Sequence, residues 1–226
     1  MRRNIGAAVA AGVLALVPVG PAVAPAAAAS CEDVEVIFAR GTFEAPGIGR
    51  TGDAFVNSLR PRIGDRTLGV YAVNYPASLD FARAVDGIVD SSNRIRAVVD
   101  SCPSTQIILG GYSQGAAVNA YVTMDSIPEG VVLPPGITET LGASQRDRIV
   151  AVVLFGKPSA AVVGLVNRTA PPITMGAAFV DKTLDLCAPQ DPVCEAGSLD
   201  RAAHSLYAVN GMAEQAATFA ARQLPA

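Results

Sequence analysis

The sequence predicts an α/β domain of three layers, in which helices cover both faces of a central parallel sheet of five strands. Apolar runs of strand length alternate with helical segments along the chain, an order typical of this architecture. The runs 105–113 and 148–158 are almost continuously apolar, as expected for strands that are covered on both faces. Apolar residues recur at helical spacing in residues 80–100, which predicts an amphipathic helix beside the sheet.

The remaining elements follow from the same patterns. The five expected strands cover residues 34–40, 68–76, 105–113, 148–158 and 179–188. Besides the helix at 80–100, helices are expected at residues 51–63, 116–124 and 212–224. The apolar positions that define the helix at 80–100 are Phe81, Ala84, Val85, Ile88, Ile95, Val98 and Val99. We see no internal repeat and no long linker, so one domain is expected.

Residues 1–30 have the three parts of a secretory signal. A basic start precedes an apolar run at 5–19 and a tail of small residues that ends near Ala29. A retained membrane anchor is the alternative, but the apolar run is short for a membrane span and is broken by Pro18. We therefore expect an exported protein, secreted or held at the cell wall, whose folded domain covers residues 31–226.

Four cysteines, all of them after residue 30, indicate two disulfides in an exported chain. Three pairings are possible, and we favour Cys31 with Cys102 and Cys187 with Cys194 because the second pair encloses a short loop. In the chain-entropy model the long bridge stabilises by about 4 kcal/mol and the short one by about 2.5 kcal/mol. The short bridge is therefore expected to serve geometry more than stability. A metal site is the competing interpretation, but C-x-x-C spacing is absent and one histidine offers little support.

The charge balance excludes one class of partner. The chain has a net charge of −3, and loss of residues 1–30 removes two arginines and no acid, which gives −5. No basic stripe is present, and this argues against a nucleic-acid partner.

A glycine-rich turn contains a candidate nucleophile. Residues 111–115 read Gly-Tyr-Ser-Gln-Gly, which fits G-x-S-x-G, and they lie between a predicted strand and a predicted helix. This is the context of a nucleophile elbow, in which a sharp turn exposes a serine hydroxyl and small flanking residues relieve its crowding. The pattern predicts that Ser113 is a nucleophile.

A serine hydroxyl needs a base to take its proton, and His204 is the only histidine of the chain. A lone histidine is more often a surface or core residue, but this one follows the last predicted strand, where a hydrolase base belongs. Asp191 precedes it, follows that strand and lies on the loop that the short disulfide would hold. Asp185 and Asp200 are its rivals as the orienting acid. The order Ser113, Asp191, His204 is that of the α/β hydrolases.

The chain resembles the cutinase family of secreted serine esterases. The likeness covers roughly residues 31–222 and rests on "FARGT" after the first strand, "GGYSQG", "CAPQDPVC" and "AAHSLY". The high content of Ala and Gly and the excess of Arg over Lys are similar to those of the actinobacterial members. The resemblance implies that Thr42 and Gln114 supply the oxyanion-hole donors, with Thr42 in the place of the serine of the fungal enzymes. The alternative for Thr42 is a plain turn residue.

The loop 47–52 reads Gly-Ile-Gly-Arg-Thr-Gly and fits the dinucleotide pattern G-x-G-x-x-G. Its first glycine lies seven residues beyond the end of the first predicted strand at Arg40, and no acidic residue ends the second. We therefore expect no NAD site here, and no cofactor or metal elsewhere.

Two departures bear on the substrate. Asp200 and Arg201 stand where fungal cutinases carry a mostly aliphatic stretch before the histidine, so cutin is a doubtful natural ester. The apolar segments 131–136 and 160–166 could line an acyl site, or they could be core or loop residues. No insertion long enough for a lipase-type lid is evident.

The sequence thus predicts a lidless, monomeric, secreted carboxylic ester hydrolase acting on small-molecule or lipid esters, with transient contact to a lipid surface. Two alternatives are a phospholipase, thioesterase or acyltransferase with the same triad, and a non-catalytic surface protein built on a hydrolase scaffold.

Overall fold

The computed structural model describes residues 31–127, 135 and 139–225. The expected signal, residues 1–30, lies outside the described residues, as does nearly all of the apolar segment 131–136.

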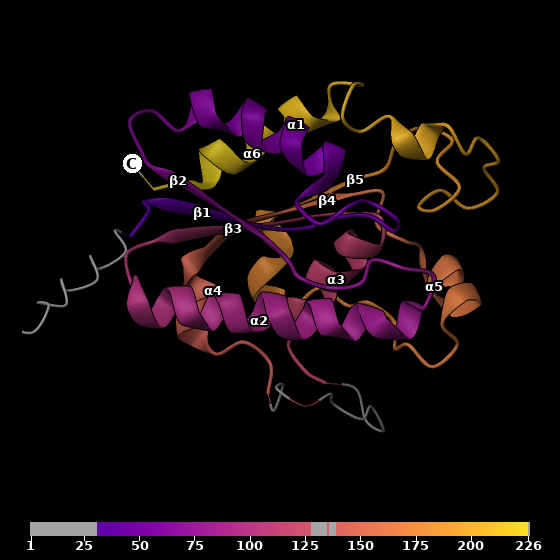
Figure 1. Ribbon diagram of the computed structural model, residues 1–226, viewed down its shortest axis with the longest axis horizontal. Coiled ribbons are helices and arrows are strands. Elements are labelled where there is room, and N and C mark those ends of the chain that lie inside the picture. Colours follow the sequence, from indigo (N-terminus) through magenta and orange to yellow (C-terminus); the bar gives the residue numbers. More distant parts are fainter. Residues whose placement is uncertain (1–30, 128–134, 136–138, 226) are drawn as a thin grey trace, which may run out of the picture. The chain divides into compact units, whose positions relative to one another are not determined.

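A parallel sheet of five strands forms the centre of the domain, as predicted (Figure 1). Its strands are β1 (Val34–Ala39), β2 (Leu68–Ala72), β3 (Gln106–Tyr112), β4 (Ile149–Phe155) and β5 (Thr183–Leu186). They lie in the order β2-β1-β3-β4-β5, and every neighbouring pair is parallel. The strand order therefore reverses between β1 and β3, and ligands bind at the carboxyl ends of strands at such a point.

Helices cover both faces of the sheet. Helix α1 (Gly49–Leu59) and helix α6 (Met212–Gln223) pack together on one face, while α2 (Ala84–Ser101), α3 (Gln114–Val122) and α4 (Ala143–Arg148) cover the other (Figure 1). Each face has its own apolar core, one beneath α1 and α6 and one beneath α2 and α3. Strand β1 is buried along its whole length, including Glu35, whose carboxylate pairs with Arg94 over 2.6 Å.

Two strand boundaries differ from the prediction by four residues, and the others agree to within three. Strand β2 ends at Ala72, four residues early, because the chain turns toward α2, where the Asn74 amide donates to the Asp90 carboxylate over 2.8 Å. Residues Ala177–Lys182, partly assigned to the last strand, form a 3-10 helix. Phe179 is buried there as a core anchor while Val180 is exposed, so the apolar pattern reflected one anchor rather than a pleated strand.

Two short helices were missed. Helix α4 has no buried residue, and helix α5 (Ala160–Val166) has none either. Elements of six or seven residues without a buried stripe give no periodic signal. Among the described residues, no helix is long and apolar enough to cross a membrane.

Both disulfides are present with the pairing favoured from the sequence. Cys31–Cys102 joins the segment before β1 to the end of α2, and Cys187–Cys194 closes a short loop after β5. The first bridge joins segments 71 residues apart in the sequence, whereas the second joins residues seven apart within one loop.

Candidate active site

The predicted site residues converge at the carboxyl edge of the sheet. Thr42 follows β1, Ser113 follows β3, and Asp191 and His204 both follow β5. Thr42 and Ser113 therefore flank the point where the strand order reverses. Their meeting follows from the topology, because the carboxyl ends of parallel strands share one edge.

Ser113 occupies a strained backbone turn between β3 and α3. Its φ angle is +54°, a backbone conformation that residues other than glycine rarely adopt. A Cβ atom on Gly111 would lie 2.3 Å from the Gly115 carbonyl oxygen, and one on Gly115 would lie 2.0 Å from that of Ala39. The two glycines of the motif are therefore required by close backbone approach, and the turn presents the Ser113 side chain outward.

A hydrogen-bonded chain joins the three residues of the expected triad. His204 Nε2 lies 2.8 Å from Ser113 Oγ, and His204 Nδ1 lies 2.7 Å from Asp191 Oδ2. The Asp191 side chain is fully buried, whereas that of His204 is 18 % exposed. In this geometry an imidazole can take the serine proton while the carboxylate fixes its orientation.

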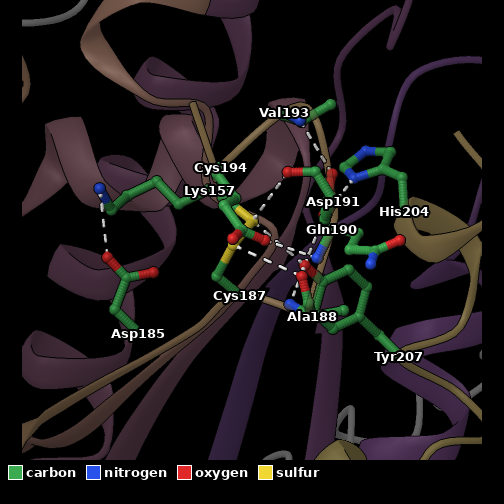
Figure 2. Close-up of a disulfide and its surroundings, with 11 residues drawn as sticks. Lys157, Asp185, Cys187, Ala188, Gln190, Asp191, Val193, Cys194, His204 and Tyr207 are labelled. Carbon is green, nitrogen blue, oxygen red and sulfur yellow. Dashed lines mark hydrogen bonds and ion pairs between the residues drawn. A yellow bond between two sulfur atoms is a disulfide. The ribbon is translucent and has the colours of Figure 1, made fainter. Parts of the chain in front are cut away.

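Tyr207 is a contact of the site that the sequence interpretation missed. Its hydroxyl donates to Asp191 Oδ2 over 2.5 Å and accepts from the Ala188 amide over 2.9 Å. The Val193 amide donates to the other Asp191 oxygen over 2.9 Å (Figure 2). Burial raises the pKa of Tyr207, so the hydroxyl keeps the proton that it donates. In the sequence, its position three residues after His204 is the only feature that could have suggested this contact.

The two rival acids lie elsewhere. Asp185 is in β5 and pairs with Lys157 over 3.2 Å (Figure 2). Asp200 is exposed and its carboxylate accepts from the Ala202 amide over 2.9 Å, which caps the turn before His204. Neither carboxylate is hydrogen-bonded to the imidazole.

The short disulfide closes the loop that carries Asp191. Cys187 and Cys194 enclose the loop that carries Asp191, and Figure 2 shows the bridge beside that carboxylate and Tyr207. The loop contains no helix or strand. Its shape is held by the bridge and by hydrogen bonds such as that from the Gln190 amide to Glu195 over 2.5 Å.

Tyr112 supports the imidazole from the elbow side and was also missed. Its ring lies 5.1 Å from that of His204, and its hydroxyl donates to the His204 carbonyl over 2.6 Å. Burial, with the nearby Glu44 carboxylate, raises the pKa of Tyr112 to about 12. Tyr112, the residue between Gly111 and Ser113 in the G-x-S-x-G motif, thus contacts the histidine.

The two expected oxyanion residues face each other across the elbow. Thr42 Oγ1 donates to Gln114 Oε1 over 3.4 Å, and Gln114 Nε2 donates to the Ser78 carbonyl over 3.1 Å. Gln114 is the first residue of α3, so its amide has no partner within the helix. Two backbone amides that border a reactive serine can hold a developing negative charge.

A buried arginine and a glutamate hold the loop of Thr42. The Arg40 guanidinium donates to the backbone carbonyls of Tyr75, over 2.6 Å, and Glu44, over 2.9 Å. The Glu44 carboxylate accepts from the amides of Gly41, over 2.7 Å, and Arg50, over 2.9 Å. An acid of the chain itself therefore binds the Arg50 amide in the first turn of α1, the part of the helix at which a pyrophosphate would bind in a dinucleotide site.

An apolar cavity of about 250 Å³ opens beside Ser113. Thr42 and Gln114 line one part of it, and Val162, Val163 and Val166 of α5 line another. The segment 160–166 is therefore a cavity wall and not part of the core.

A serine hydroxyl, an imidazole and a buried carboxylate, arranged in this order at the edge of a parallel sheet, define a serine hydrolase of the α/β hydrolase class.

Comparisons with known proteins place the chain within that class. The family model described as Cutinase matches residues 30–224. The chain is 45 % identical over 220 residues to the phospholipase Culp4 of Mycobacterium tuberculosis, covering 97 % of this chain and 90 % of that protein. It is 44 % identical over 223 residues to the carboxylesterase Culp1 of the same species, covering 98 % and 95 %.

Among solved structures, a Trichoderma reesei cutinase in complex with a phosphonate inhibitor is similar, with a TM-score of 0.64 and 35 % identity, covering 87 % of this chain and 78 % of that one. The chain therefore belongs to the cutinase family, and it is a carboxylic ester hydrolase.

Proposed function

We propose that Ser113, His204 and Asp191 are the catalytic triad of this esterase. The observation that carries the proposal is the continuous hydrogen-bonded chain from Ser113 Oγ through the imidazole to a fully buried carboxylate. His204, with its Nδ1 proton directed to Asp191, takes the Ser113 proton as Oγ bonds to the ester carbonyl carbon. The amides of Thr42 and Gln114 donate to the resulting oxyanion.

The remaining steps return the enzyme to its starting state. The imidazolium gives its proton to the leaving alkoxide as the ester C–O bond breaks, which leaves the acyl group on Ser113. A water molecule then gives a proton to His204 and attacks the acyl carbon. The acid departs as the proton returns to Ser113 Oγ, so no cofactor takes part in this cycle.

The substrate is an ester with an apolar acyl group. The cavity beside Ser113 is lined mainly by apolar side chains, including three valines of α5, and it accepts such a group by burial of apolar area. A lipid ester is the second candidate, because one similar protein is named a phospholipase. We propose that a short to medium acyl chain is the minimal substrate of either kind.

The protein acts outside the cell as a monomer. Residues 1–30 are proposed to direct export and to be removed, and two disulfides after them support an oxidising destination. The mass of the chain recovered from the medium tests export and removal of residues 1–30, because a mature chain that begins near Cys31 is expected.

A fluorophosphonate probe tests the triad. It should label the mature protein once, at Ser113, and Ser113→Ala should abolish labelling and ester hydrolysis together. Labelling that persists in the alanine variant would show that another residue is the nucleophile.

A further inference from the structure

A second apolar cavity adjoins the one beside Ser113. It has a volume of about 480 Å³ and lies between α2, α3 and the segment that follows α5, with residues 126–127, 135 and 139–141 forming a further wall. The two cavities share five lining residues, Phe81, Ala84, Tyr121, Asn167 and Ala170. No triad or oxyanion residue lines the second cavity, so a group bound to Ser113 enters it by way of the first.

One face of α3 leads from the nucleophile to the second cavity. Gln114 and Ala117 line the first cavity, Tyr121 lines both, and Met124, just beyond the helix, lines the second. Their spacing of three, four and three residues places them on one helical stripe. Ten residues at 1.5 Å each cover about 15 Å. An extended chain advances about 1.2 Å per bond, so this path suits an acyl chain of about twelve carbons.

The opposite wall comes from α2, which packs against α3 on the same face of the sheet (Figure 1). Ala84 borders both cavities, whereas Val85 and Ile88 line only the second. All three side chains are partly exposed, which leaves apolar area for a ligand to cover. Among the described residues of this lining, Glu139 alone carries a charge, and it is exposed. The lining also includes hydroxyl and amide side chains, among them Ser92, Thr140 and Asn167. The wall formed by Val85, Ile88 and Met124 is therefore the part suited to an uncharged hydrocarbon.

We propose that the second cavity binds the distal half of one long, unbranched acyl chain whose ester carbonyl lies at Ser113. This inference rests on the proposed function and adds a chain length to it. A four-carbon acyl group occupies the first cavity alone, whereas a twelve-carbon group extends past Ala84 and Tyr121 into the second. Each methylene that leaves water for the cavity raises kcat/KM by up to about fourfold.

The experiment measures kcat/KM for soluble esters with acyl chains of four, eight and twelve carbons, at concentrations where they remain monomeric. For the unchanged protein, kcat/KM should rise by about tenfold or more between eight and twelve carbons. Val85→Trp and Ile88→Trp fill the second cavity from one wall, and each should lower the twelve-to-four-carbon ratio by about tenfold or more.

The control is Ala97→Trp, which places the same side chain on an exposed position of α2 that lines neither cavity and should keep the parent ratio. A profile that is flat beyond eight carbons in the unchanged protein, or ratios unchanged in both cavity variants, would overturn the proposal. Failure to hydrolyse even the four-carbon ester, without labelling at Ser113, would instead refute the proposed function.

Discussion

The two halves of the proposed catalytic centre, Ser113 and Asp191, are positioned in different ways. Ser113 is fixed by a backbone joint between β3 and α3, in which Gly111 and Gly115 permit contacts that no other residue allows. Asp191 lies on a loop without regular structure, and a disulfide and the Tyr207 hydroxyl hold it. Ser113 is thus set by the backbone of one strand-to-helix turn, whereas Asp191 is set by a covalent bridge across its own loop and by a side-chain hydrogen bond from Tyr207. Changes to the second half can impair catalysis while the fold remains intact.

The largest effect is expected from the acid itself. Asp191→Asn should lower kcat by roughly three to four orders of magnitude, by analogy with loss of the orienting carboxylate from the serine protease triad. Asp200→Asn is the matched control, since its carboxylate caps a surface turn and should cost far less. Steady-state rates on one short-chain ester compare the two variants. An inactive Asp200→Asn enzyme beside an active Asp191→Asn enzyme would mean that the acid is misassigned.

The next largest effect separates the two disulfides. Replacing Cys187 and Cys194 by serine should lower kcat by about tenfold to a hundredfold, because a displacement near 1 Å of a catalytic group has that cost. Replacing Cys31 and Cys102 by serine should instead lower the free energy of unfolding by about 4 kcal/mol and leave kcat near its original value. Denaturant titrations and initial rates measure both quantities. Equal effects on kcat from both pairs would remove the distinction between a geometric and a stabilising bridge.

A smaller effect is expected at Tyr207. Tyr207→Phe keeps the buried ring but removes one donor to the Asp191 carboxylate, so kcat should fall about tenfold while KM stays within about twofold. The lost donor leaves more charge on the carboxylate, which favours the imidazolium and should move the acid limb of kcat/KM to higher pH. A purely structural role predicts a lower melting temperature with an unmoved limb. Kinetics across the pH range distinguish the two outcomes.

The smallest effect concerns alkaline stability. Burial is the leading cause of the raised pKa of Tyr75, Tyr112 and Tyr207. A group whose folded pKa is raised stabilises the fold below its unfolded pKa of about 10, and this contribution is lost as the pH rises through the folded value. The free energy of unfolding should therefore decline above about pH 10. Tyrosinate absorbance that appears well below the unfolding transition, with all three residues ionised, would contradict the buried, protonated state.

The same contrast explains how far the sequence could predict the site. The elbow at Ser113 is a local pattern, and the single histidine left one candidate base. Asp191 could be chosen because it follows the last strand and lies between two cysteines. Tyr207 and Tyr112 could not be chosen, because a buried tyrosine that donates to a catalytic group has the same local pattern as one that fills the core.

The fold shows the same limit. Nearly continuous apolar runs predicted the buried strands β3 and β4, whose type is fixed by burial on both faces. Helix α5 gave no signal because its valines line a cavity instead of forming a buried stripe. The strand predicted at 179–188 begins only at Thr183, because its first residues belong to a 3-10 helix in which Phe179 is a single buried anchor. Position relative to a cavity is a tertiary property, and local patterns do not encode it.

The single histidine allows a direct test of the central claim, that one imidazole held between Ser113 and Asp191 activates the nucleophile. The acid limb of kcat/KM reports the ionisation of the essential base in the free enzyme, and the imidazole signal in an NMR titration can only come from His204. Log(kcat/KM) should fall with a slope near one, and its midpoint should coincide with that of the NMR titration. A steeper slope, or two midpoints that differ by more than experimental error, would contradict the account.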